Sequence, residues 1–413
     1  MILSEELQAR GFIKQASCDD LTTIFDKEKR VVYHGIDPSA NSAHAGNFVI
    51  WMMLKHLVKN GFKLVFLVGG GTGMIGDPKP DAERVLKDKE AVDSNVFQIQ
   101  QQAKKFFGEE NISFVDNYDW LGSLGLISFL RDIGKHFTVN ELIKKDAISK
   151  RLESEVGLSY TEFAYPLLQA YDYLKLYRDS DATLQIGGSD QWANIVAGVD
   201  LVRRVEKKTV YATTVPLIID KATGKKFGKS EGNAVWLDPS QTSPYSFYQF
   251  WLNVDDKSVV EYLKLFTLLP LLDIERLESG VKSDPGSRLA QKTLAKEVTV
   301  LVHGVEEFEK VGKVTGLLFS EVSFVDLLEE QIVFLKDNAL SLVVEEGSLL
   351  VDILLEINLA SSKREARTFV ENNAVSVNDM KISDVNYQLK KEVDGEVVCL
   401  RRGKKQVSVI EIG

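Results

Sequence analysis

Two short segments of the chain carry residue types suited to binding a phosphorylated ligand. The first, residues 37–47, holds His44, Gly46 and Asn47 between a predicted strand and a predicted helix. A helix N-terminus presents unpaired N–H groups and the positive end of the helix dipole, which suit phosphate. Gly46 lets a ligand approach the backbone closely. His44 and Asn47 are three residues apart, so both side chains can reach one ligand from the first helical turn.

The second segment is Lys225-Lys226-Phe227-Gly228-Lys229-Ser230, which follows a predicted strand. Two lysines on either side of a glycine give a doubly positive arm that can neutralise triphosphate charge as it builds up in a transition state. Each segment has an ordinary alternative when taken alone. The histidine is more often a helix cap or a surface residue, and the lysines are more often part of a solvated loop.

The elements around these segments predict a parallel sheet. Apolar runs end in glycine- or proline-containing loops, and a helical stretch from Phe48 to Asn60 separates the first two runs. This strand–helix–strand order is a βαβ unit, in which ligands bind beyond the carboxyl ends of the strands. The predicted strands lie at 31–33, 63–68, 112–115, 184–186 and 215–219. Loops leave from such strand ends at His34, Gly69, Gly187 and Asp220.

The chain is long enough for several domains, because one core rarely grows past about 250–300 residues. After about residue 240 the pattern becomes helical, and a last small unit begins near Leu349. We therefore expect an α/β fold with four parts. These are a Rossmann-like catalytic domain at 1–238, an α-helical domain at 239–325, a linker at 326–346 and a small α+β module at 347–413.

Taken together, the two segments resemble the signatures of the class I aminoacyl-tRNA synthetases. His44-Ala45-Gly46-Asn47 resembles their HIGH motif, with Asn47 in place of the second histidine and Ala45 in place of a larger aliphatic residue. Lys226-Phe227-Gly228-Lys229-Ser230 resembles their KMSKS loop. An asparagine still donates a hydrogen bond, so a role on ATP is compatible with this departure.

Within that class, longer segments resemble the tyrosyl-tRNA synthetases of bacteria over nearly the whole chain. The matching segments are 33–38 (YHGIDP), 73–78 (GMIGDP), 131–137 (RDIGKHF), 168–173 (LQAYDY), 185–192 (QIGGSDQW) and 243–245 (SPY). The resemblance implies activation of L-tyrosine by ATP to tyrosyl-adenylate and pyrophosphate, followed by transfer of tyrosine to the 3′ end of tRNA(Tyr). It also implies a homodimer, with tRNA spanning both subunits.

Carried over residue by residue, the resemblance implies a tyrosine site with two ends. Tyr33 and Asp172 bind the phenolic hydroxyl, and discrimination of tyrosine from phenylalanine in this family is the standard case of a site that rejects an analogue lacking the hydroxyl. Asp77, Tyr165 and Gln169 bind the α-ammonium group. Gln191 orients the carboxylate that attacks ATP.

The resemblance likewise implies the ATP site and the catalytic groups. Gly188 and Asp190 hold the ribose, and Ser39 joins His44 and the two lysines around the phosphates. The ATP-binding set is Gly35, Asp37, Ser39, His44, Gly46, Asn47, Gly188, Asp190, Lys226, Phe227 and Lys229. The catalytic set is His44, Asn47, Lys226, Lys229 and Ser230. Mg²⁺ accompanies ATP on phosphate oxygens, and no zinc is expected.

The C-terminal region has its own RNA-binding pattern. Residues 361–370 read as a capped helix carrying Lys363, Arg364 and Arg367, and Val375–Asn378 reads as a strand entering a turn. This resembles the alpha-L RNA-binding module of bacterial tyrosyl enzymes, whose basic residues meet RNA phosphates. A surface helix with solvated charges is the plainer alternative. Arg84 falls in a region where the family contacts the tRNA acceptor end.

Composition narrows the classes further. Hydrophobic residues make up 44% of the 413 residues, and the net charge is −10, which argues against a generally basic nucleic-acid coat. Residues 347–413 hold ten Lys/Arg and ten Asp/Glu, so residues 1–346 carry the whole negative excess. Cys18 and Cys399 are too few and too far apart for a disulfide framework. With no secretory signal and no apolar run long enough for a membrane helix, we expect a cytoplasmic protein that does not associate with membranes.

Three rival functions remain to be weighed. Residues 71–76 fit GxGxxG after a strand, as in a dinucleotide-binding dehydrogenase, but Pro78 and Pro80 break the helix that should follow. Tryptophanyl-tRNA synthetases share both signatures, whereas the pairing of Tyr33 with Asp172 favours a phenol over an indole. A non-enzymatic RNA-binding relative is supported only by Asn47.

Overall fold

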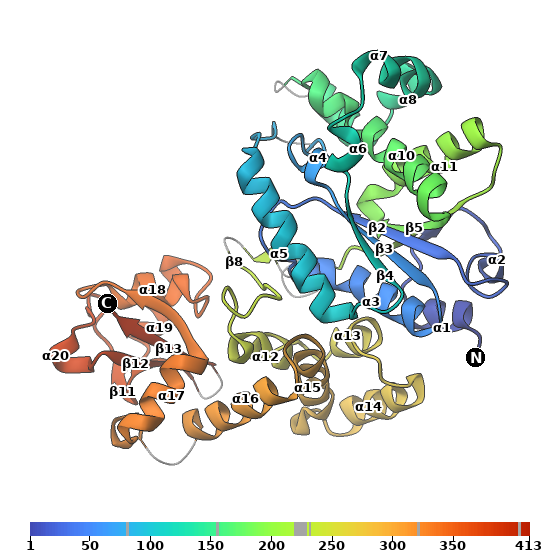
Figure 1. Ribbon diagram of the computed structural model, residues 1–413. Helices are drawn as coiled ribbons and strands as arrows, with labels where there is room; N and C mark the ends of the chain where they lie inside the picture. The colour runs from blue at the N-terminus through green and yellow to red at the C-terminus, as the bar shows by residue number, and fades with distance from the viewer. Residues whose placement is uncertain (80–81, 154–156, 219–228, 231–232, 320–322, 404–405) are drawn as a thin grey trace. The chain divides into compact units, whose positions relative to one another are not determined.

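The computed structural model describes residues 1–79, 82–153, 157–218, 229–230, 233–319, 323–403 and 406–413 (Figure 1). Contacts divide the chain into two compact units. The first comprises Met1–Trp236 and Asp255–Ala290, and the second comprises Leu237–Val254 and Gln291–Gly413. The helices at 255–290 therefore belong to the first unit, together with residues 1–236, although they lie within the predicted helical stretch.

The first unit is built on a six-stranded sheet in the order β1-β6-β5-β2-β3-β4. Its strands are β1 (Gln15–Ala16), β2 (Val31–Ile36), β3 (Lys63–Val68), β4 (Ile112–Asp116), β5 (Ala182–Gly188) and β6 (Tyr211–Val215). Neighbours from β6 to β4 pair in parallel, whereas the edge strand β1 pairs antiparallel with β6. The predicted parallel sheet is confirmed. Strand order changes direction between β2 and β5, the place where doubly wound sheets bind ligands.

One predicted strand was placed too late. The run 215–219 was expected to be a strand, but β6 ends at Val215 and residues 216–218 lie in no strand, while residue 219 is outside the described residues. The next residue is Pro216, which has no N–H to donate to a neighbouring strand. The proline therefore ends β6 at the point where the apolar pattern predicted that a strand begins.

Helices cover both faces of this sheet because alternate strand residues point to opposite sides. Tyr33, Val65 and Leu67 pack with residues of α10 (Tyr160–Ser180) and α11 (Trp192–Glu206). On the other face, Phe66 contacts Trp51 of α3 (Ala45–Lys59) and Phe107 of α5 (Lys89–Phe107) at ring-centroid distances of 5.6 and 6.0 Å. Both faces are therefore closed, as a parallel sheet requires.

Short elements complete the first unit. They are α1 (Leu3–Arg10), α2 (Leu21–Phe25), α4 (Gly70–Gly73), α6 (Tyr118–Leu121), α7 (Leu126–Ser128), α8 (Val139–Leu142), α9 (Asp146–Glu153), β7 (Lys229–Ser230), β8 (Asn233–Ala234), α13 (Val259–Phe266) and α14 (Leu271–Ser283).

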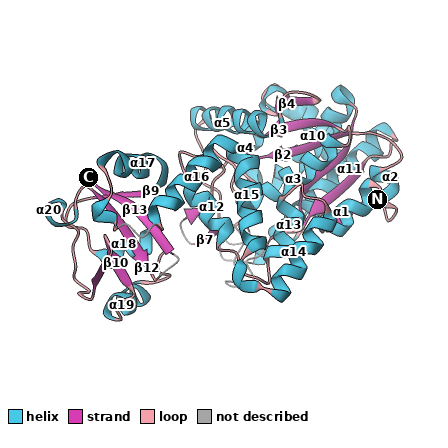
Figure 2. Ribbon diagram, turned by 90° about the horizontal axis from the view of Figure 1, so that it is seen from below, coloured by secondary structure: helices cyan, strands magenta, loops and turns pink. Residues whose placement is uncertain are grey.

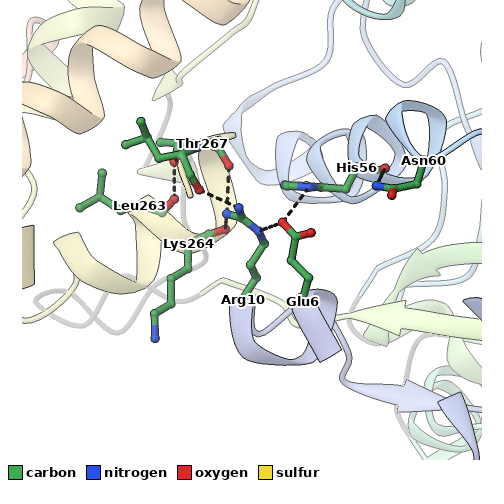
Figure 3. A network of polar contacts seen from close by, with 8 residues as sticks. Glu6, Arg10, His56, Asn60, Leu263, Lys264 and Thr267 are labelled. Carbon is green, nitrogen blue, oxygen red and sulfur yellow. Dashed lines mark hydrogen bonds and ion pairs between the residues drawn. The ribbon is translucent and has the colours of Figure 1, made fainter. Parts of the chain in front are cut away.

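A buried arginine joins the two sequence segments of this unit (Figure 3). Arg10 of α1 donates to the backbone carbonyls of Lys264, Thr267 and Leu269 at 3.2, 3.3 and 2.7 Å, in the last turn of α13 and just after it. It also pairs with Glu6 at 2.9 Å. The guanidinium thus satisfies carbonyls that a helix end leaves without intrahelical partners. Phe266, within that helix, stacks on Phe48 in the first turn of α3, with centroids 5.7 Å apart.

The second unit joins helices to a five-stranded sheet in the order β11-β10-β12-β13-β9 (Figure 2). Its strands are β9 (Leu340–Val344), β10 (Val375–Val377), β11 (Met380–Ile382), β12 (Val397–Arg402) and β13 (Gln406–Ile412). Its helices are α12 (Pro244–Leu252), α15 (Leu289–His303, from Gln291 onward), α16 (Val305–Leu318), α17 (Glu329–Ala339), α18 (Leu350–Glu356), α19 (Lys363–Glu371) and α20 (Lys391–Asp394).

Alternate residues of this sheet face two cores. Val398, Leu400 and Ile410 pack with α18 and α19, whereas Cys399 and Val409 pack with α12, α16 and α17. The segment expected as a linker holds α17 and β9, and β9 pairs in parallel with β13. The C-terminal sheet thus shares a core with the helices that precede it.

Candidate active site

The phenol end of the predicted site lies where Tyr33 of β2 meets α10. The Tyr33 side chain is buried, and its hydroxyl has no hydrogen-bond partner among the described residues. Its ring makes an edge contact with Tyr173, with centroids 4.9 Å apart. Because an unpaired buried hydroxyl costs free energy, this group is suited to a ligand that supplies the missing partner.

Asp172 on α10 is the second group at this end, and two donors hold its carboxylate. Trp120 Nε1 lies 2.7 Å from Oδ1, and Asn117 Nδ2 lies 2.9 Å from Oδ2. Burial raises the pKa of Asp172 to about 7, and the two hydrogen bonds oppose that shift. Each oxygen keeps a lone pair beyond its one donor, so the carboxylate can accept a further hydrogen bond from a ligand hydroxyl.

The ammonium end is centred on Asp77. Its Oδ2 accepts from Gln191 Nε2 at 2.8 Å, and its Oδ1 accepts from Asn194 Nδ2 at 3.1 Å. Burial raises the pKa of Asp77 above its ordinary value. The side-chain amide oxygen Oε1 of Gln169 is also buried and has no hydrogen-bond partner in the described part of the chain. A carboxylate and an amide oxygen are acceptors that suit a cation with three donors.

Tyr165, which was predicted to bind the α-ammonium group, contacts a residue of the predicted nucleotide site. Its hydroxyl donates to Oδ2 of Asp37 at 2.8 Å, and Thr72 Oγ1 lies 2.7 Å from Oδ1 of the same carboxylate. Burial raises the pKa of Asp37 to about 6. Tyr165 therefore links the predicted tyrosine site to Asp37, which belongs to the predicted nucleotide site.

The glycines after β3 make room for these acidic side chains. A Cβ on Gly69 would lie 2.4 Å from Asp37 Oδ1, and a Cβ on Gly70 would lie 2.3 Å from Asp116 Oδ1. Both distances are far below van der Waals contact. Residues 71–73 of the run that suggested a dinucleotide fingerprint lie in α4, where the Thr72 hydroxyl donates to the Asp37 carboxylate.

His44 is the N-cap of α3. Its Nδ1 accepts from the Gly46 backbone N–H at 3.0 Å, while Asn47 Oδ1 accepts from the His44 backbone N–H at 3.2 Å. The pair forms a reciprocal cap, which accounts physically for an asparagine at position 47. A capping role and a ligand-binding role for His44 and Asn47 are compatible, because the cap holds both side chains at the start of the helix.

The segment after the predicted lysine arm returns to His44. Ala45 N donates to the Val235 carbonyl at 2.8 Å, and His44 forms an isolated β-bridge with Trp236. Lys226 and Phe227 lie outside the described residues. Lys229 and Ser230 form β7, which pairs with β8. The backbone thus brings the end of one predicted signature close to the other.

The remaining nucleotide residues lie at strand ends or in the loops that follow. Gly35 and Ser39 are exposed on either side of Asp37. Gly188 ends β5, and a Cβ there would lie 2.6 Å from Oδ1 of Asp190. The glycine at position 188 therefore leaves room for the Asp190 carboxylate, which any larger residue there would displace.

Sequence reasoning missed four residues that shape the tyrosine site. Asn117 and Trp120 hold Asp172, Asn194 holds Asp77, and Lys145 Nζ lies 3.1 Å from Asn194 Oδ1. Burial lowers the pKa of Lys145 to about 8. A signal existed for Asn117, which directly follows a strand at the ligand-binding edge. No short motif marks Lys145.

The predicted RNA-binding residues are exposed in the second unit. Lys363, Arg364 and Arg367 lie on α19, which Ser362 caps by accepting from Glu365 N, and Lys363 pairs with Asp352 at 2.8 Å. In the first unit, Arg84 Nε donates to the Asp77 carbonyl at 2.6 Å. Arg84 is thus tied to the backbone of the ammonium site.

The described residues contain neither a membrane-spanning helix nor a cluster of metal ligands. No described helix is both long and apolar enough to traverse a lipid bilayer. Within the described ranges, no cluster of three or more His, Cys, Asp or Glu side chains is arranged to hold a metal ion.

Comparison with known proteins places these features in one group. Residues 26–320 match the family model of class I tRNA synthetases (W and Y), and residues 331–410 match that of the tyrosine–tRNA ligase SYY-like C-terminal domain. The chain is 44% identical to the tyrosine–tRNA ligase of Streptococcus pneumoniae serotype 19F (strain G54), over 99% of this chain and 100% of that one. It is 43% identical to the tyrosine–tRNA ligase of Limosilactobacillus fermentum, over 100% of both. A C-terminally truncated mitochondrial tyrosyl-tRNA synthetase of Aspergillus nidulans superposes with a TM-score of 0.68 at 29% identity, covering 77% of this chain and 94% of that one.

Proposed function

The chain belongs to the class I tRNA synthetases for tryptophan and tyrosine, where it falls among the tyrosine–tRNA ligases, and from this membership we propose how its residues carry out the reaction. The enzyme activates L-tyrosine with ATP, releases pyrophosphate and transfers tyrosine to the 3′ end of tRNA(Tyr). The observation that carries our assignment of residues is the buried hydroxyl of Tyr33, which has no hydrogen-bond partner within the described ranges, together with the Asp172 carboxylate that two donors hold.

In this proposal the phenolic hydroxyl of the substrate donates to Asp172 and accepts from Tyr33. Such a site rejects phenylalanine, because phenylalanine would leave the buried Tyr33 hydroxyl without a partner and would give the Asp172 carboxylate no donor in place of the substrate hydroxyl. At the other end, Asp77 and Gln169 receive the α-ammonium group, and Tyr165 contributes through its contact with Asp37. Gln191, fixed by its bond to Asp77, orients the substrate carboxylate.

The reaction needs no nucleophile from the protein. The tyrosine carboxylate attacks the α-phosphorus in line, an oxygen–phosphorus bond forms, and the bond to the β-phosphate oxygen breaks to release pyrophosphate. The protein acts by positioning and by charge stabilisation. His44, Asn47, Lys226, Lys229 and Ser230 would stabilise the charge on the phosphates. The ribose would lie against Gly188 and Asp190, and the rest of the nucleotide along Gly35, Asp37, Ser39, Gly46 and Phe227.

Mg²⁺ would enter with ATP as part of the substrate, held mainly by phosphate oxygens. We further propose a cytoplasmic homodimer. Exposed apolar side chains of the first unit support it, because Leu126, Ile127, Val139 and Tyr160 are 62–74% exposed. Exposed apolar surface of this kind marks interaction sites.

The division of labour along the chain is also a proposal. Catalysis belongs to residues 1–238, anticodon recognition to helices within 239–325, and RNA binding to 347–413, with 326–346 connecting them. Exposed Lys363, Arg364 and Arg367 on α19 support the last assignment. Arg84 would approach the tRNA acceptor end.

The experiment that tests the function is tyrosylation of tRNA(Tyr) by the purified chain with labelled tyrosine and ATP. The proposal predicts acid-precipitable tyrosyl-tRNA that forms only when ATP and tRNA(Tyr) are both present. Folded protein that binds tRNA(Tyr) but forms no product would contradict it.

A further inference from the structure

Arg151 on α9 is a fully buried arginine that no step of the proposed reaction uses. Its side chain is 0% exposed, and it pairs with Glu162, which is 2% exposed. Both terminal nitrogens of the guanidinium take part: Nη1 lies 3.1 Å from one carboxylate oxygen, and Nη2 lies 3.1 Å from the other. This two-point geometry fixes the guanidinium plane as well as its charge.

The same guanidinium also binds the backbone at three points. Nη1 donates to the carbonyls of Lys79 and Ala82 at 3.1 and 2.5 Å, and Nη2 donates to the Gly157 carbonyl at 2.5 Å. Lys79 is two residues after Asp77, the carboxylate at the ammonium end. Arg151 therefore holds the backbone immediately downstream of Asp77.

The partner carboxylate belongs to the other half of the site. Glu162 lies in the first turn of α10, where its backbone N–H donates to the cap residue Ser159 at 3.3 Å. The same helix carries Gln169 and Asp172. One buried guanidinium thus connects the Asp77 segment to the helix that bears the phenol-binding carboxylate.

Stability alone is a weak explanation for such a pair. Replacing a buried ion pair by apolar side chains of similar volume is often neutral or stabilising, because the charges lose their hydration. Apolar side chains could fill the space but could not bind three carbonyls. A lysine could keep the charge, but its single ammonium cannot span the positions that the planar fork reaches.

We propose that Arg151 is a positioning residue for the amino-acid site, which fixes Asp77 relative to α10 and thereby sets affinity for the α-ammonium group of the substrate. The inference rests on the proposed role of Asp77. Arg151 itself touches no substrate.

The test is tyrosine-dependent exchange of pyrophosphate into ATP by the Arg151→Lys variant of the full chain. We expect the KM for tyrosine to rise about tenfold and the KM for ATP to change less than twofold. The inhibition constant of 3-(4-hydroxyphenyl)propionate, which has the phenol and the carboxylate but no ammonium group, should also change less than twofold. An unchanged KM for tyrosine, or equal increases for tyrosine and the analogue, would overturn the inference.

Three further variants make the result decisive. Arg178→Lys, in the exposed pair that Arg178 of α10 forms with Glu206 at 2.7 Å, is the matched control and should leave every constant unchanged. If Arg151→Lys does not fold, Arg151→Met combined with Glu162→Leu removes the carbonyl bonds without leaving a lone buried charge. Folded double variant with a normal KM for tyrosine would overturn the inference.

Asp77→Asn separates this inference from the function on which it rests. If Asp77→Asn raises the KM for tyrosine and the Arg151 variants do not, only the role of Arg151 is wrong. If Asp77→Asn leaves that KM unchanged, the proposed role of Asp77 is wrong, and the inference falls with it.

Discussion

The indole nitrogen of Trp120 lies 2.7 Å from Oδ1 of Asp172, and this hydrogen bond favours the charged form of a carboxyl whose pKa burial raises to about 7. Asn117 binds the other oxygen. The balance between burial and these donors decides whether Asp172 can accept a hydrogen bond from the substrate near neutral pH.

This balance predicts a pH dependence. Asp172 takes up a proton as the pH falls through about 7, so kcat/KM for tyrosine should fall below that pH, approaching tenfold per pH unit. Trp120→Phe removes a donor to the charged form, which raises the pKa, so the midpoint should move to higher pH. Exchange rates measured from pH 5.5 to 8.5 at subsaturating tyrosine test both points. A flat profile, or a midpoint that Trp120→Phe lowers, would contradict the assignment.

Tyr33→Phe should affect specificity more than folding. The hydroxyl is buried and has no partner in the described residues, so its removal leaves no orphaned group and the melting temperature should not fall. A neutral hydrogen bond contributes about 0.5–1.5 kcal/mol, so kcat/KM for tyrosine should fall by about twofold to thirteenfold, while that for phenylalanine does not fall. Exchange with both amino acids measures this ratio. Equal losses of kcat/KM for tyrosine and phenylalanine would show that the Tyr33 hydroxyl does not bind the substrate hydroxyl.

The exposed apolar residues of the first unit predict a homodimer. Ile127 is 74% exposed, and a charge placed there should disfavour burial against a second copy. Ile127→Asp should therefore shift the sedimentation of the chain from dimer towards monomer at micromolar concentration. Leu272→Asp, at a 59% exposed position on α14, is the control and should stay dimeric. A wild-type chain that sediments as a monomer would contradict the proposal.

The basic helix of the second unit predicts a separable effect on tRNA. Replacing both Arg364 and Arg367 by Ala should weaken tRNA(Tyr) binding and lower the slope of log affinity against log salt by about 1–2, because fewer counterions are released. Tyrosine-dependent pyrophosphate exchange should stay unchanged. Lys391→Ala, an exposed cation on α20, should leave both unaffected. An unaltered salt slope in the double variant would place the RNA contacts elsewhere.

The sequence predicted the parts of this protein that local rules control. Apolar runs ending in glycine loops predicted β2 to β5, and the Ser362 cap with its basic helix predicted α19. The strand at 215–219 was misplaced because the apolar pattern outweighed Pro216. Residues 326–346 looked like a linker because their apolar pieces are short, although β9 pairs with a strand more than sixty residues later.

The site shows the same limit. Residues within long motifs, such as Tyr33, Asp77 and Asp172, could be named from the sequence. Arg151 could not, because its partners at positions 79, 82, 157 and 162 come together only in the folded chain. Contacts of this kind depend on tertiary packing, which hydrophobic periodicity does not encode.

The most direct test of the account is amino-acid-dependent exchange of labelled pyrophosphate into ATP, with all twenty amino acids supplied singly to the wild-type chain. We predict exchange with tyrosine alone, because only tyrosine pairs both Tyr33 and Asp172. Exchange supported by tryptophan, or no exchange from folded protein that still binds tRNA, would contradict it.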